Sequence, residues 1–177
     1  MSRDKMQVLS NMLSHETAHF WFGGLVQSNL NEQWLSEGFA QFFCLYLNGI
    51  YFGSESKKAI LSNYLDKLNE IPLTEQAPLA NISLDSPNQV FLVRCKTAIV
   101  LNILLESINE KDFILIIRQT VKKYKNKFIT TALIKELWTS MLPDFDFESF
   151  FRIHFYEVNR YVALENGQIS TMPNIHM

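Results

Sequence analysis

Residues 15–24 read His-Glu-Thr-Ala-His-Phe-Trp-Phe-Gly-Gly, and they begin with two histidines four positions apart. On a helix, residues four apart project from one face, so the imidazoles of His15 and His19 can bind the same ion. Glu16 lies beside that face, where its carboxylate can hold a water molecule and take its proton. The pattern therefore predicts a catalytic zinc site. The alternative, from these five residues alone, is a buried helix with two hydrogen-bonded histidines.

A second stretch, residues 34–40, reads Trp-Leu-Ser-Glu-Gly-Phe-Ala and contains Glu37. Together the two stretches resemble the zinc aminopeptidase family of the gluzincin clan, which includes alanyl and glutamyl aminopeptidases and leukotriene hydrolases. The resemblance is specific for residues 12–47 and diffuse but collinear beyond them. It implies a mainly α, thermolysin-like fold, the helical half of a zinc peptidase catalytic domain. It also implies one Zn²⁺ held by His15, His19 and Glu37, and a metallopeptidase that acts on peptides with a free N-terminus.

Two positions depart from the family pattern near this site. The family usually has a glutamate that hydrogen-bonds a ligand histidine where this chain has Cys44. We expect Cys44 to pack in the core, with a thiolate ligand as the alternative and Gln41 as a neutral acceptor. The family's oxyanion tyrosine lies in a pattern like YxKGA, and the matching residues 94–98 read Arg-Cys-Lys-Thr-Ala. Arg94 is therefore a second candidate catalytic residue, in addition to Glu16, because a permanent cation can stabilise an oxyanion. The alternative is a charge on a helix surface.

A third departure concerns substrate binding. The family's GAMEN-like strand, whose glutamate binds the substrate's amine, precedes the zinc helix, and nothing before His15 resembles it. We therefore interpret residues 1–159 as a partial catalytic domain and residues 160–177 as a C-terminal strand and tail that opens a following β-domain. A missing N-terminal β-domain or a partner chain would complete the protein, and the chain alone should be a weak or inactive peptidase.

The alternative function is a non-catalytic, aminopeptidase-like scaffold or interaction module. The helix around Cys95 and Lys96 resembles, more weakly, the aminopeptidase-like subunit of the transcription factor complex that carries the TATA-binding protein. In that relative the fold serves assembly. Such relatives tend to lose the zinc ligands, whereas His15, His19 and Glu37 are all present here.

The composition bears on the class of the protein, its binding partners and its cellular location. The chain has 177 residues, 47% hydrophobic and 19% charged, with a net charge of -2, which indicates a globular protein without a basic surface for nucleic acid. No apolar run reaches the roughly 18 residues that a membrane span needs, and residues 1–5 lack the core of a signal peptide. Cys44 and Cys95 form no paired motif, so a reducing, cytoplasmic compartment is favoured. Aromatic residues make up 13% of the chain, which suggests a surface that contacts a partner or a missing domain.

Hydrophobic periodicity predicts an almost entirely helical chain. The first helix should place Val8, Met12, His15, His19 and Phe22 on one face and end at the glycine pair after Phe22. An ordered loop should occupy residues 71–88, a strand residues 160–164, and a turn the Asn-Gly pair at 166–167. The predicted helices cover residues 4–22, 31–52, 54–68, 90–107, 109–121, 131–141 and 146–155.

Overall fold

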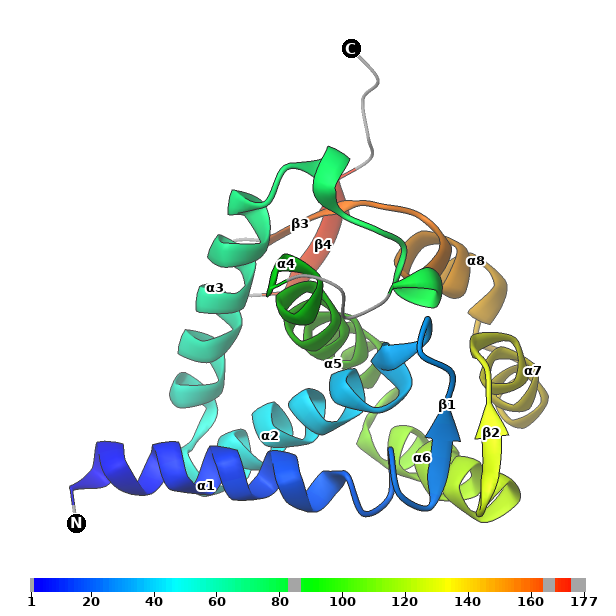
Figure 1. Ribbon diagram of the computed structural model, residues 1–177, viewed down its shortest axis with the longest axis horizontal. Helices are drawn as coiled ribbons and strands as arrows, with labels where there is room; N and C mark the ends of the chain where they lie inside the picture. Colours follow the sequence, from blue (N-terminus) through cyan, green and yellow to red (C-terminus); the bar gives the residue numbers. More distant parts are fainter. Residues whose placement is uncertain (1, 83–86, 164–167, 173–177) are drawn as a thin grey trace.

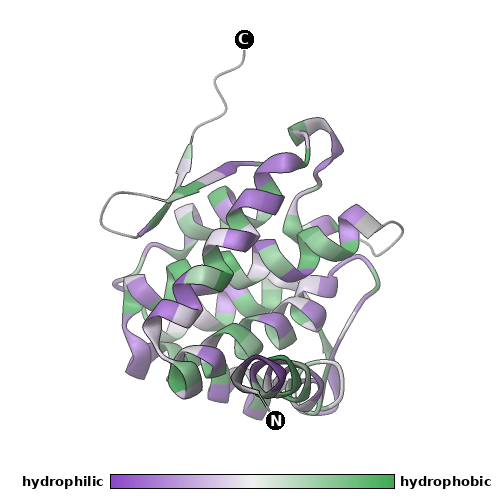
Figure 2. Cartoon of the chain, turned by 90° about the vertical axis from the view of Figure 1, so that its left-hand side faces the viewer, coloured by the Kyte–Doolittle hydropathy of each residue, from purple (hydrophilic) through white to green (hydrophobic). Residues whose placement is uncertain are grey.

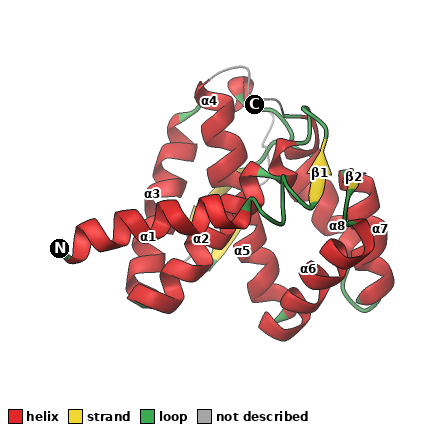
Figure 3. Cartoon of the chain, turned by 60° about the horizontal axis from the view of Figure 1, so that its bottom comes forward, coloured by secondary structure: helices red, strands yellow, loops and turns green. Residues whose placement is uncertain are grey.

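The computed structural model describes residues 2–82, 87–163 and 168–172, and most of these residues are helical (Figures 1 and 3). The mainly α prediction is therefore confirmed. The α-helices are α1 (Arg3–Ala18), α2 (Glu37–Phe52), α3 (Ser54–Glu70), α4 (Pro87–Phe91), α5 (Thr97–Ile108), α6 (Glu110–Tyr124), α7 (Thr131–Met141) and α8 (Phe147–Phe151).

Helix α2 is the centre of the packing, because it contacts α1, α3 and α5 (Figure 1). Its buried residues include Phe39, Phe42 and Leu45, which form part of one continuous hydrophobic core. Helices α6, α7 and α8 pack in succession beyond α5. Hydrophobic and hydrophilic stretches alternate along the helices, as an amphipathic bundle requires (Figure 2). None of the helices in the described part of the chain combines the length and the apolar character needed to cross a membrane.

The strands form two short pairs. Strand β1 (Val26–Ser28) pairs in parallel with β2 (Lys127–Ile129), and β3 (Arg160–Ala163) pairs antiparallel with β4 (Ile169–Met172). The second pair confirms the predicted C-terminal strand or hairpin, while the turn predicted at 166–167 lies outside the described residues. The β1–β2 pair was not predicted, since three-residue strands are too short to show an alternating pattern.

Helix α1 differs from its prediction at its end. It ends at Ala18, four residues before Phe22, and the chain then turns through Gly23 at a φ of 111°. Along the predicted face, Val8 is 69% exposed and Met12 is 56% exposed, whereas His15 is buried. The reason is that α1 packs chiefly on α2, and only its C-terminal end enters the core.

The second predicted helix also begins later than its pattern suggested. A 3-10 turn, Gln33–Leu35, places Trp34 and Leu35 in the core, and α2 then begins at Glu37. Glu37 is therefore the first residue of α2. The Trp34 indole nitrogen donates to the Thr131 hydroxyl at 2.8 Å, which fixes this turn against α7.

The helix predicted over residues 90–107 is longer and irregular. Helix α4, a π-helical turn (Leu92–Lys96) and α5 follow one another without a break. Arg94 lies in the π-helical turn, a form that adds a residue to a helical turn and often occurs at functional sites. The predicted caps at Asn109 and Asp146 are confirmed, since their side chains accept from the backbone amides of Asp112 and Ser149.

Gly38 allows α2 to approach the start of α5. A Cβ atom at Gly38 would lie 2.5 Å from the Cβ of Thr97, a distance that real structures do not show. Thr97 is itself fully buried. The missing side chain at Gly38 therefore lets the first turn of α2, with Glu37, lie beside the π-helical turn that carries Arg94.

The C-terminal hairpin closes over a buried lysine. The Tyr161 side chain of β3 is fully buried, and its hydroxyl lies 3.1 Å from Nδ1 of His154. Lys96 is also fully buried, with its Nζ 5.9 Å from the centre of the Tyr161 ring and without a hydrogen-bond partner among the described residues. Burial lowers the pKa of Lys96 to about 8 and, with the neighbouring Lys96 charge, the pKa of His154 to about 4.

Candidate metal centre

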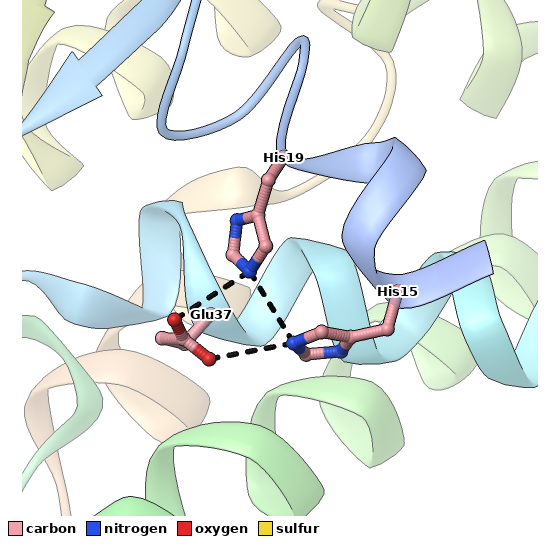
Figure 4. A group of neighbouring side chains, drawn as sticks. All are labelled: His15, His19 and Glu37. Atoms are coloured by element: carbon pink, nitrogen blue, oxygen red, sulfur yellow. Dashed lines mark hydrogen bonds and ion pairs between the residues drawn. The ribbon is translucent and has the colours of Figure 1, made fainter. Parts of the chain in front are cut away.

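Helices α1 and α2 bring the three predicted ligands to one point (Figure 4). The Nε2 atoms of His15 and His19 lie 3.3 Å apart. Nε2 of His15 is 3.5 Å from Oε2 of Glu37, and Nε2 of His19 is 3.5 Å from Oε1 of Glu37. Within residues 2–82, 87–163 and 168–172, these three residues are the group whose geometry could hold a metal ion.

These distances fit a tetrahedral zinc ion. Zinc binds imidazole nitrogen at about 2.0–2.1 Å, so two ligand atoms on one tetrahedron lie about 3.4 Å apart. The distances of 3.3 Å and 3.5 Å between the His15, His19 and Glu37 atoms match that edge. Two neutral imidazoles and one carboxylate leave a fourth position open, which is the arrangement of catalytic rather than structural zinc sites.

A hydrogen bond fixes the orientation of His19. Its Nδ1 lies 3.1 Å from the carbonyl oxygen of Phe22, and because a carbonyl only accepts, Nδ1 must carry the proton. The lone pair of Nε2 then points toward His15 and Glu37. Gly23 contributes to this contact, since a Cβ atom there would lie 3.2 Å from the same Nδ1. The turn after α1 therefore prepares His19 to bind a metal.

His15 lacks the corresponding support. It is buried, and its Nδ1 has no hydrogen-bond partner among the described residues. Cys44 is also buried, and burial raises the pKa of its thiol to about 11, so it packs as a neutral side chain. The amide nitrogen of Gln41 donates to the hydroxyl of Tyr64 instead. Neither Cys44 nor Gln41 therefore replaces the glutamate that the family pattern has in this place.

The structure places Arg94 against the candidate ligand Glu37. Nε of Arg94 donates to Oε2 of Glu37 at 2.9 Å, and Nη2 lies 2.6 Å from the same oxygen. The hydrogen bond from His15 and the charge and hydrogen bond of Arg94 hold the pKa of Glu37 at about 2, although burial opposes them. The sequence predicts Arg94 near the site as a candidate oxyanion donor, but no local pattern predicts its pairing with Glu37.

Glu16 lies on the solvent side of the same helix end. Its side chain is exposed, and it lines a hollow of about 420 Å³ together with His19, Phe20, Gly24 and Leu25. The hollow therefore joins the candidate general base to one of the candidate metal ligands. A role for Glu16 as general base stays a prediction.

The sequence matches the peptidase family M1 domain over residues 1–154. Human endoplasmic reticulum aminopeptidase 2 is 29% identical over 145 residues, which cover 78% of this chain and 15% of that protein. The alanine/arginine aminopeptidase of Saccharomyces cerevisiae is 31% identical over 150 residues, which cover 79% of this chain and 17% of that protein. The chain therefore spans less than a fifth of the length of these relatives.

Solved structures share the fold. The M1 zinc metallopeptidase from Deinococcus radiodurans aligns with a TM-score of 0.70 at 21% identity, over 82% of this chain and 32% of that one. Yeast leukotriene A4 hydrolase aligns with a TM-score of 0.66 at 20% identity, over 79% of this chain and 25% of that one. Sequence and fold thus confirm the family resemblance, and the chain belongs to the M1 family of peptidases.

Proposed function

We propose that this chain is the zinc-binding part of an aminopeptidase-type metallopeptidase that cleaves the peptide bond next to a free N-terminus. His15, His19 and Glu37 would hold a single Zn²⁺. The observation that carries the proposal is the convergence of their ligand atoms at distances of 3.3 Å and 3.5 Å, which match a zinc tetrahedron. Membership of a family with zinc metallopeptidases among its solved structures supports the choice of metal.

The proposed chemistry assigns a task to each side chain. A bound zinc ion polarises a carbonyl oxygen and lowers the pKa of water. Glu16 takes the proton of the attacking water and then delivers it to the leaving amine, as its place beside His19 allows. Arg94 is the candidate for positive charge near the developing oxyanion, because its guanidinium lies beside the ligand Glu37.

We further propose that the chain needs additional protein for efficient catalysis. The relatives are several times longer, and residues 1–14 contain no match to the glutamate that binds the substrate amine in the family. A preceding β-domain or a partner chain would supply it. A cytoplasmic location stays a prediction from the two unpaired cysteines, Cys44 and Cys95, and one relative is an endoplasmic reticulum aminopeptidase.

Hydrolysis of leucyl- and alanyl-anilides by the purified chain tests this function, with metal analysis of the same samples. We expect stoichiometric zinc, slow hydrolysis, and loss of hydrolysis without loss of zinc in Glu16→Gln. Glu37→Ala should lose most of the zinc. Zinc binding without any turnover, even after a separately expressed upstream domain is added, would favour the scaffold instead. Absence of zinc from both the chain and Glu16→Gln would contradict the proposal.

A further inference from the structure

We propose that Arg94 competes with zinc for Glu37, so that its guanidinium weakens metal binding and moves away when the metal enters. This inference rests on the proposed function, because it takes His15, His19 and Glu37 as the zinc ligands. It gives Arg94 a second role, as an internal cation that occupies the metal centre. The contacts, the charge balance and the exposure of Arg94 support it.

The contacts show that Arg94 lies directly against one oxygen of Glu37. Oε2 of Glu37 accepts a hydrogen bond from Nε of Arg94 at 2.9 Å and lies 2.6 Å from its Nη2. The same Oε2 is the oxygen nearest to Nε2 of His15, at 3.5 Å. A zinc ion bound between His15 and Oε2 would therefore lie close to the guanidinium and compete with it for this oxygen.

The charge balance of the centre also disfavours zinc binding while Arg94 is in place. Arg94 neutralises the carboxylate of Glu37, and the other two ligands are imidazoles. Cys44, on the same face of α2 as Glu37, remains a neutral buried thiol. A dication that used only the other oxygen of Glu37 would still lie beside the guanidinium and be repelled by it. The site therefore offers zinc little net negative charge while Arg94 stays in place.

Arg94 is also able to leave. Its side chain is 41% exposed, whereas that of Glu37 is 19% exposed. The guanidinium can thus move into water without crossing the core, and Glu37 can stay in position for the metal. An exposed arginine that pairs with a more deeply buried carboxylate is suited to exchange with another cation.

The test measures zinc affinity of the 177-residue chain by competition with a coloured chelator at constant pH and ionic strength. We expect Arg94→Gln to bind zinc at least tenfold more tightly than the wild-type chain, and Arg94→Lys to stay closer to wild type because it keeps the charge. Arg152→Gln is the matched control, since it removes an arginine from another ion pair, that with Glu157. It should change zinc affinity less than threefold.

A second measurement uses the unmodified chain, so it does not depend on how a variant folds. Phenylglyoxal reacts with free guanidinium groups, and mass spectrometry can locate the product. We expect zinc to increase the labelling of Arg94 and to leave that of Arg152 unchanged.

The outcomes separate this inference from the proposed function. Equal or weaker zinc binding by Arg94→Gln, with binding still abolished by Glu37→Ala, would overturn the competition and leave the metal centre standing. It would then identify Arg94 as a residue that positions Glu37 for the metal. Failure of both the wild-type chain and Arg94→Gln to bind zinc at millimolar concentration would overturn the metal centre and the competition together. Unchanged or reduced labelling of Arg94 with zinc would also contradict the competition.

Discussion

At the scale of a single residue, Lys96 shows how the burial of a charged group lowers the stability of the folded state. Its side chain is fully buried, and its Nζ has the ring of Tyr161 at 5.9 Å but no hydrogen-bond acceptor among the described residues. An unpaired buried ammonium is costly, so the folded state favours the neutral amine. The pKa of Lys96 accordingly falls from 10.5 to about 8.

This lowered pKa predicts a pH dependence of stability. Between about pH 8 and 10.5 the unfolded chain keeps the proton on Lys96 while the folded chain loses it, so the contribution of Lys96 to stability rises with pH. Below pH 8 both states hold the proton, and the full cost remains. Relative to Lys96→Met, the free energy of unfolding of the wild-type chain should rise by up to about 3 kcal/mol across this range.

Urea unfolding of both proteins at several pH values checks the prediction. The buried thiols of Cys44 and Cys95 and the partly buried Tyr64 have raised pKa values, so they lower stability as the pH rises above about 9. They act in both proteins, so the difference between wild type and Lys96→Met isolates the lysine. A difference that stays constant from pH 7 to 10 would show that Lys96 has an unperturbed pKa.

The residues of the metal centre were predictable to different degrees. His15 and His19 follow from helical spacing alone, and Glu37 from its surrounding motif. The contact between Arg94 and Glu37 was not predictable, since it joins residues 57 positions apart through the packing of two elements. The hydrogen bond from His19 to the Phe22 carbonyl was hidden as well, because it depends on the early end of α1 at Ala18.

At the scale of elements, the close approach of α2 and α5 depends on Gly38. Because a Cβ atom would lie 2.5 Å from Thr97, Gly38→Ala must push the two helices apart. Overpacking of this kind typically costs about 1–3 kcal/mol. We expect Gly38→Ala to lower the melting temperature by several degrees and to weaken zinc binding, since Glu37 is the neighbouring residue.

Gly49, on the same helix, is the matched control. A Cβ atom there would meet only the flexible side chain of Lys57, at 3.1 Å. Alanine is favoured over glycine inside a helix by about 0.5–1 kcal/mol, so Gly49→Ala should leave the melting temperature unchanged or raise it. Thermal unfolding by circular dichroism compares the two variants. If Gly38→Ala is as stable as Gly49→Ala, the approach of α2 to α5 does not depend on the missing side chain.

The elements themselves were largely predictable. Helices with strong caps or a clear apolar face, such as α6 and α7, were placed to within a few residues at their ends, because Asn109 and Thr131 mark their starts. The 3-10 turn before α2 and the π-helical turn before α5 were not, since both depend on tertiary packing rather than on local preference. The same holds for the burial of α1, where Val8 and Met12 are at helical spacing with His15 but stay exposed.

At the scale of the whole molecule, the exposed apolar side chains of α1 form a surface that nothing in the described chain covers. The large apolar residues that α1 exposes are 40–69% accessible, and they are Met6, Val8, Leu9, Met12 and Leu13. Beside them, α1, α2 and α6 enclose an apolar hollow of about 480 Å³ lined in part by Ala18, Phe43 and Ile117. A large exposed apolar patch usually marks a contact surface. The relatives contain several times more protein, which agrees with the proposed additional domain.

This surface predicts that the isolated chain associates with itself. Burying exposed apolar area gains about 25 cal/mol per Å², so an uncovered patch of this kind favours contacts between copies of the chain. The double variant Val8→Lys, Met12→Glu leaves the net charge unchanged and should shift the chain toward monomer in sedimentation equilibrium.

Leu115→Lys with Phe128→Glu is the matched control, because these residues are 41% and 63% exposed but lie on α6 and β2. Zinc affinity should be the same in all three proteins, since the metal ligands are untouched. A wild-type chain that stays monomeric at high concentration, or a control that dissociates as well as the α1 variant, would show that α1 is not the contact surface.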